Sequence, residues 1–182
     1  MNNVKCEIKK LVIPTYPEPA AEEMPMFAEN RVHQRTSGRP YPNKVVLRVD
    51  RENKIGKEYT VVVLGNEYLK IEILPEIGGR IYSALDKTTG YDFFYKQHVI
   101  KPALIGVLGS WISGGVEFNW PFHHRASGFM PCDFVTETLP DGTAVCHLSE
   151  RDPIDRMKGM VSIVLRPGEK RFETRMRLYN RT

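Results

Sequence analysis

Residues 69–85 read LKIEILPEIGGRIYSAL, and this stretch decides the class of fold. Positions 69–73 alternate apolar and charged residues, which is the period of an antiparallel strand with one buried face. Pro75 ends this strand, and Gly78-Gly79 permits a tight backbone bend before a second strand at residues 81–85. The stretch therefore predicts two neighbouring strands of an antiparallel sheet.

Similar strand-like runs, separated by turn residues, occupy much of the chain. The expected strands cover residues 45–49, 59–64, 68–74, 81–85, 91–95, 133–139, 143–150, 160–165 and 171–178. Pro140-Asp141-Gly142 and the sequence RPGE at residues 166–169 are typical hairpin turns. Residues 98–110 fit a short helix or an irregular segment equally well. With no long amphipathic helix, the pattern predicts an all-β antiparallel sandwich or barrel.

The first 43 residues differ in composition, because they hold six of the thirteen prolines. Proline fixes φ and restricts the preceding residue, so we expect an extended N-terminal arm over residues 1–43. Residues 4–13 are a candidate short strand that pairs with a sheet edge. The alternative for the arm is a partly disordered tail. The β-sandwich domain is expected over residues 44–182.

Composition excludes several classes of protein. A chain of 182 residues that is 41% hydrophobic can bury one sizeable core. The net charge of +4 is small and its basic residues are scattered, which argues against a nucleic-acid partner. No apolar run reaches the ~18 residues of a membrane helix. The three cysteines, at positions 6, 132 and 146, lack metal-ligand spacing, so we expect free thiols, a cytoplasmic location and no cofactor.

The most distinctive stretch for function is residues 111–131, WISGGVEFNWPFHHRASGFMP. It mixes five aromatic rings with two histidines, an arginine and a glutamate, and it follows neither a helical nor a strand period. Apolar walls with a few polar groups are typical of ligand sites, and aromatic walls suit the C–H face of a sugar ring. The alternative is a buried structural loop whose polar groups are satisfied internally.

Glu117 is the leading candidate for acid–base chemistry. An apolar setting favours the protonated form of a carboxyl, which is what a general acid requires. The alternative is that Glu117 pairs with Arg80 or Arg125 and only holds the loop. Arg125 could instead bind a carboxylate, phosphate or vicinal diol of a ligand, and Arg80 could point its guanidinium into the cleft or form a structural pair.

His123 and His124 are adjacent, so on a strand they would point to opposite faces and at most one would meet a ligand. No third residue at zinc spacing accompanies them, so we expect no metal site. The candidate catalytic residues are therefore Glu117, His123 and His124.

Substrate contacts are expected from arginines, tryptophans and two further carboxylates. Trp111 and Trp120 could stack on a sugar or lie in the core. Glu150 or Asp152 could supply a second carboxylate, as glycosidases need, or cap a turn. The candidate substrate-binding residues are Arg80, Trp111, Trp120, Arg125, Glu150 and Asp152.

Three segments resemble a known family: LPEIGGRIYSALDKTTGYDFFY (residues 74–95), GGVEFNWPFHH (residues 114–124) and the stretch from residue 151 to residue 182. They are similar to an uncharacterised bacterial domain family that commonly precedes tetratricopeptide repeats and is assigned to the galactose mutarotase-like superfamily. The resemblance covers residues 44–182 and implies a large antiparallel β-sandwich that binds a monosaccharide unit on a concave face.

The chain departs from that superfamily in two ways. Its domain is shorter, so later strands are expected to be missing, and with them the glutamate base of the sugar epimerases. Residues 126–129 only loosely match a conserved segment of the hexose-6-phosphate mutarotases. Epimerase roles are therefore not transferred to residues of this chain.

Three hypotheses follow for function. The first is a carbohydrate-active domain that hydrolyses glycosides or epimerises a sugar in a longer protein. The second is a non-catalytic sugar-binding module, and the third is a structural interaction module preceding helical repeats. We expect a saccharide ligand, neither a nucleic-acid nor a membrane partner, and self-association through a sheet edge or the N-terminal arm.

Overall fold

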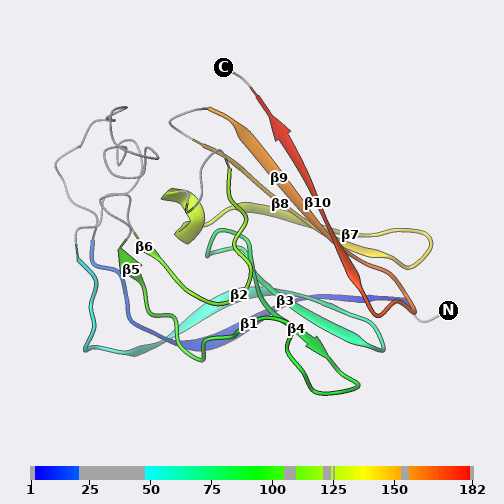
Figure 1. Ribbon diagram of the computed structural model, residues 1–182, viewed down its shortest axis with the longest axis horizontal. Coiled ribbons are helices and arrows are strands. Elements are labelled where there is room, and N and C mark those ends of the chain that lie inside the picture. Colours follow the sequence, from blue (N-terminus) through cyan, green and yellow to red (C-terminus); the bar gives the residue numbers. More distant parts are fainter. Residues whose placement is uncertain are drawn as a thin grey trace.

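The computed structural model describes residues 3–20, 48–104, 110–120, 124, 126–152 and 156–180. It contains two four-stranded antiparallel sheets, ordered β1-β2-β3-β4 and β10-β9-β8-β7, and a small two-stranded sheet, β5-β6. Figure 1 shows the two large sheets close together near the N-terminus and spreading apart toward the opposite end. The all-β antiparallel sandwich expected from the sequence is confirmed.

The first large sheet and the small sheet come from the N-terminal two-thirds of the chain. Their strands are β1 (Lys5–Thr15), β2 (Ile55–Gly65), β3 (Leu69–Leu74), β4 (Arg80–Asp86), β5 (Ala103–Leu104) and β6 (Ser110–Trp111). The short helix η2 (Ala126–Phe129) follows, and the second large sheet comprises β7 (Asp133–Thr138), β8 (Ala144–Arg151), β9 (Lys158–Leu165) and β10 (Phe172–Tyr179).

The alternation at residues 69–73 gives the expected strand β3. Leu69, Ile71 and Ile73 point into the core between the large sheets and are at most 2% exposed. Glu72 lies on the other face, where its carboxylate binds the ammonium groups of Lys70 (2.6 Å) and Lys96 (3.2 Å). One face of the strand is thus apolar and the other pairs charges, as period 2 requires.

The first sheet is covered on both faces. Val62 and Leu64 join the core between the sheets, which also contains Ile163 and Leu165 of the second sheet. Tyr59, Val61 and Val63 belong to a separate cluster on the opposite face, together with two residues from the later part of the chain, Ile100 and Ile112. Burial on both faces explains why residues 61–64 are continuously apolar rather than alternating.

The second sheet is a meander of hairpins. The turn at residues 139–143 joins β7 to β8, and the turn at residues 166–171 joins β9 to β10, as the turn sequences predict. Gly142 and Gly168 have φ values of 83° and 72°, which glycine adopts without a Cβ penalty.

The expected strand at residues 91–95 is wrong. Only one bridge forms there, between Leu85 and Asp92. The Asp92 carboxylate accepts hydrogen bonds from the Ser83 hydroxyl and from the Ala84 amide at 3.1 Å, and these local bonds replace a strand ladder. Burial alone would raise the pKa of this carboxyl, yet the hydrogen bonds outweigh it and lower the pKa below its usual value.

The N-terminal region contributes the edge strand β1. Residues 5–15 pair with β2 in a continuous register from Lys5↔Gly65 to Thr15↔Ile55, so the expected pairing of residues 4–13 with a sheet edge is confirmed. The boundary expected between residues 43 and 44 lies within 21–47, outside the described residues. Residues 45–47 of the expected strand at 45–49 lie there too, and residues 48–49 form no strand.

All three cysteines are free thiols. Cys146 is completely buried in the main core, and burial raises its pKa to about 12, so the thiol stays protonated at neutral pH. Burial raises the pKa of the partly exposed Cys6 as well. Neither thiol has the lowered pKa of a reactive cysteine. No helix within the described ranges is both long enough and apolar enough to cross a membrane.

Candidate functional site

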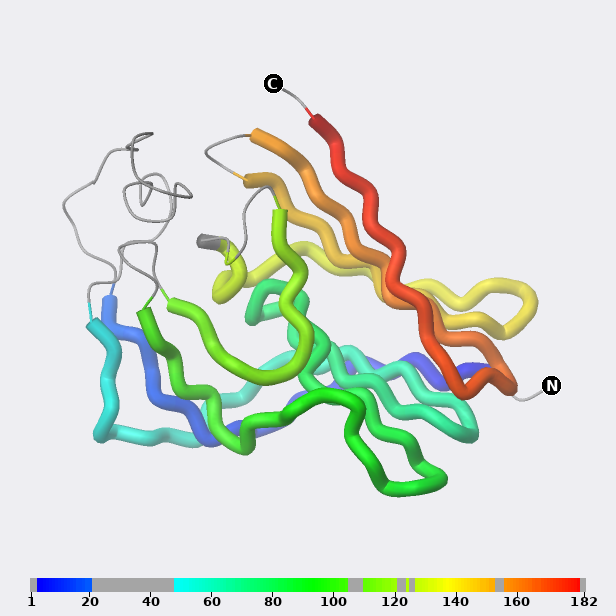
Figure 2. Tube along the Cα trace, viewed as in Figure 1, coloured from blue at the N-terminus to red at the C-terminus, as the bar shows by residue number. Residues whose placement is uncertain are grey.

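Two glycines fix the segment that carries the candidate site. Gly114 and Gly115 have φ values of 88° and 67°. A Cβ on Gly115 would lie 2.1 Å from the carbonyl oxygen of Ile81, so only glycine permits this approach to β4. The next residue, Val116, exchanges two backbone hydrogen bonds with Ile81, at 2.9 Å and 3.2 Å. Residues 110–120 thus run along the first sheet and then rise toward the second (Figure 2).

This anchoring places Glu117 beside His124. Oε2 of Glu117 lies 3.0 Å from Nδ1 of His124, within hydrogen-bond distance. The Glu117 side chain is 15% exposed and that of His124 is 39% exposed, so solvent reaches the pair mainly from the imidazole side. The imidazole also contacts the ring of Trp111, with ring centres 5.2 Å apart and planes at 52°.

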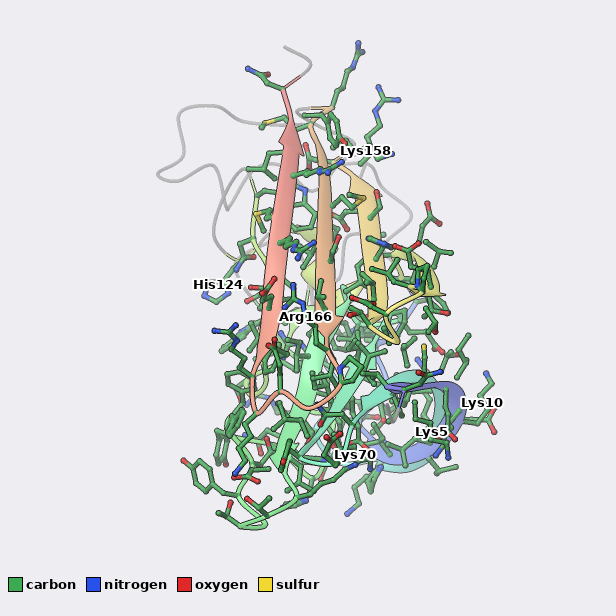
Figure 3. The ribbon with its side chains drawn as sticks, turned by 90° about the vertical axis from the view of Figure 1, so that its right-hand side faces the viewer. Lys5, Lys10, Lys70, His124, Lys158 and Arg166 are labelled. Carbon is green, nitrogen blue, oxygen red and sulfur yellow. The ribbon has the colours of Figure 1, made fainter. Side chains whose placement is uncertain are left out.

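These three residues come from different elements. Trp111 ends β6, Glu117 follows the bridge to β4, and His124 precedes η2. His124 has a φ of 48°, an unusual conformation for a residue that is not glycine. Figure 3 shows it at the edge of the molecule, well separated from Lys5 and Lys10 of β1. We refer to Trp111, Glu117 and His124 as the imidazole cluster.

Arg80 is a buried residue that binds the backbone of this cluster's segment. It is 2% exposed, and its Nη1 donates hydrogen bonds to the carbonyl oxygens of Ile112 (2.9 Å) and Gly114 (2.7 Å). Burial lowers the pKa of the guanidinium, and the charge of Glu117 opposes that shift. Arg80 therefore holds the backbone between Trp111 and Glu117 and also compensates the negative charge of Glu117.

Trp120 and Glu150 contact the second sheet and the helix η2. Trp120 is 4% exposed, and its indole packs on Gly159 of β9 as part of the core. Glu150, half-buried at the end of β8, accepts a hydrogen bond from the Ser127 hydroxyl. The gap lined by Trp120, Glu150 and Phe118 has no room for even one water molecule.

The remaining expected site residues are Asp152, His123 and Arg125. The backbone amide of Asp152, just after β8, donates to the carbonyl oxygen of Met157, just before β9, at 2.8 Å. His123 and Arg125 lie outside the described residues. Among those that are described, no group of three or more His, Cys, Asp or Glu side chains is placed to hold a metal ion.

Two polar arrangements were missed by the sequence analysis. Ser127 is 8% exposed and its hydroxyl donates to Glu150. A serine inside a glycine-containing loop does not by itself indicate a buried polar contact. On the outer face of the second sheet, His147 contacts the Ser162 hydroxyl through Nδ1 (2.7 Å) and Glu137 through Nε2 (2.9 Å). Only the register of β7, β8 and β9 brings these three side chains together.

The imidazole cluster has the chemistry of an acid–base site. A carboxyl and an imidazole within hydrogen-bond distance are the kinds of group that transfer protons to and from a ligand. An indole ring beside them offers a flat apolar surface for the C–H face of a ligand.

Comparisons with known proteins agree with the fold. The profile of a family described as "Domain of unknown function (DUF5107)" matches residues 40–182. The chain is also similar to the crystal structure of a TPR-domain containing protein from Parabacteroides distasonis, with a TM-score of 0.80 and 22% sequence identity. That match covers 97% of this chain and 29% of the other, so this chain spans less than a third of that protein's length.

Proposed function

The chain belongs to the DUF5107 family of domains of unknown function, and from this premise we propose that it is a carbohydrate-binding β-sandwich domain of the galactose mutarotase-like type. The observation that supports this proposal is the hydrogen bond of 3.0 Å between Glu117 and His124 beside the ring of Trp111. An apolar ring next to an acid–base pair offers a sugar both of the surfaces that it needs.

In the longer protein, we propose that the cluster acts on the sugar as well as binding it. The reaction would be glycoside hydrolysis or anomeric epimerisation, both of which need proton transfer at a sugar oxygen. His124 and Glu117 would carry that proton between them, and Arg80 would keep Glu117 in place. A cytoplasmic location fits the free thiols.

A non-catalytic sugar-binding module is the second candidate. The similar crystal structure is that of a TPR-domain containing protein, of which this chain covers 29%. A domain that precedes helical repeats could present a glycan to them without altering it. The two candidates share the imidazole cluster and differ only in turnover.

We expect Trp111→Ala to weaken saccharide binding about tenfold, because it removes the stacking surface while leaving the sheets intact. Ligand-detected NMR against a panel of mono- and disaccharides measures this change. Tyr91→Ala is the matched control, since Tyr91 is an aromatic residue that is 66% exposed and whose backbone bonds to Asp86 and Thr89. Binding to no saccharide, or equal loss in both variants, would contradict the proposal.

The catalytic and the binding candidates are separated by Glu117→Gln in the full-length protein. An enzyme would lose turnover about 100-fold or more and keep its affinity, because the amide cannot transfer the proton. A binding module shows no turnover in either form.

A further inference from the structure

A cavity separate from the imidazole cluster lies on the outside of the first sheet, and it has a volume of about 340 Å³. This volume falls within the range of small-molecule pockets, roughly 300–1,000 Å³. Its apolar walls include Val99, Pro102 and Ile112, and its polar lining consists of Arg51, Gln97, Lys101 and Ser113. We refer to these seven residues as the basic pocket.

The basic pocket contains two cations and, in its described lining, no carboxylate. Neither Arg51 nor Lys101 forms an ion pair with an acidic residue of the described ranges. The Lys101 ammonium is instead held over the ring of Tyr16, 4.8 Å from its centre. Two positive charges that face one cavity, with no carboxylate in its described lining, favour an anionic ligand.

The backbone around Lys101 is fixed by the first sheet. The Tyr16 amide donates to the carbonyl oxygen of Ile100 (2.9 Å), and the Ile100 amide donates to that of Pro14 (2.8 Å). Lys101 therefore follows directly on a segment paired with the end of β1. A charge held on a fixed backbone loses less entropy when it binds a ligand than one on a free loop.

The pocket lining also offers neutral hydrogen-bonding groups. Nε2 of Gln97 donates to the Ser113 hydroxyl oxygen at 3.0 Å. This arrangement leaves the hydroxyl hydrogen of Ser113 and the side-chain amide oxygen of Gln97 to bind a ligand. The Gln97 backbone is itself held by the Tyr82 hydroxyl, which donates to its carbonyl oxygen at 2.8 Å. An amide and a hydroxyl are typical partners for sugar hydroxyls.

We propose that the basic pocket binds a hexuronate, a sugar whose carboxylate meets Arg51 and Lys101 and whose hydroxyls meet Gln97 and Ser113. A pyranose ring fits the volume of the pocket and covers its apolar walls. The described lining of the pocket shares no residue with the imidazole cluster. This inference therefore stands whether or not the imidazole cluster binds a sugar.

We expect the chain to bind glucuronate at least about tenfold more tightly than glucose, since the carboxylate adds contacts with two cations. Arg51→Gln and Lys101→Gln should each weaken glucuronate binding about threefold, and the double variant about tenfold. Isothermal titration calorimetry at low salt measures these constants. Glucose 6-phosphate and inorganic phosphate are titrated in parallel to separate a carboxylate from a phosphate ligand.

Lys57→Gln is the matched control. Lys57 also lies over a tyrosine ring, at 4.8 Å from the centre of Tyr59, but it does not line the pocket. Its loss should leave glucuronate binding unchanged. Equal affinities for glucose and glucuronate, tighter binding of either phosphate, or an equal loss in Lys57→Gln would each overturn the proposal.

Discussion

Replacing Gly159 with alanine is expected to lower the free energy of unfolding by about 3 kcal/mol. Gly159 lies in β9, where its missing side chain makes room for the indole of Trp120. A Cβ there would lie 2.0 Å from Cε2 of the indole and 2.4 Å from its Cζ2 and Nε1. Trp120 is buried in the core and cannot move aside cheaply. Urea denaturation followed by tryptophan fluorescence measures the loss.

Gly65→Ala provides the control for this prediction. Gly65 ends β2, and a Cβ there would meet its nearest described neighbour, the Leu69 carbonyl oxygen, at 3.7 Å, an ordinary contact. We expect its stability to match that of the wild type. In the Gly159→Ala background, Trp120→Leu should recover part of the loss because the smaller side chain leaves room for the methyl group. If Gly159→Ala is as stable as the wild type, the indole does not pack on β9.

Arg80→Met is expected to lower the free energy of unfolding by about 3 kcal/mol and to loosen the imidazole cluster. Methionine retains much of the buried volume but leaves the carbonyl oxygens of Ile112 and Gly114 without their donors. It also removes the positive charge that compensates Glu117. Urea denaturation measures the stability, and amide hydrogen exchange at Gly115 reports the local opening.

Arg175→Met is the control for the arginine substitution. The Arg175 side chain is 60% exposed on β10, where it pairs with Glu173, and exposed ion pairs add little to stability. We expect this variant to unfold at nearly the wild-type urea concentration. An Arg80→Met protein that behaves like Arg175→Met would show that the buried guanidinium is not what holds residues 112–114.

Local patterns predicted the sheets well. Alternation at residues 69–73 and the turns after Leu139 and Leu165 specify strands and hairpins through interactions within a few residues. The same local reasoning failed at residues 91–95, where aromatic composition indicated a strand. A single carboxylate, that of Asp92, binds the neighbouring backbone instead, and β propensity does not include such a competing partner.

The candidate site was predicted only in part, because its contacts depend on the tertiary fold. The aromatic stretch indicated a mixed environment, but it could not separate Trp111, which meets His124, from Trp120, which lies in the core. Glu117 and His124 are seven residues apart, and no secondary-structure period brings them together. The hydrogen bonds from Arg80 to carbonyl groups could not be predicted either. Every residue has a backbone carbonyl, so the sequence does not indicate which one a side chain binds.

The edge strand β1 also has a consequence for the order of folding events. Hairpins in the second sheet close over a few residues, whereas pairing β1 with β2 requires closing the connection formed by residues 16–54. The longer closure costs about 2 kcal/mol more chain entropy, which slows that step relative to hairpin formation. We therefore expect β1 to dock last, and quench-flow hydrogen exchange should find its amides protected later than those of β8 and β9. Strands β8 and β9 would then be formed before β1 pairs with β2.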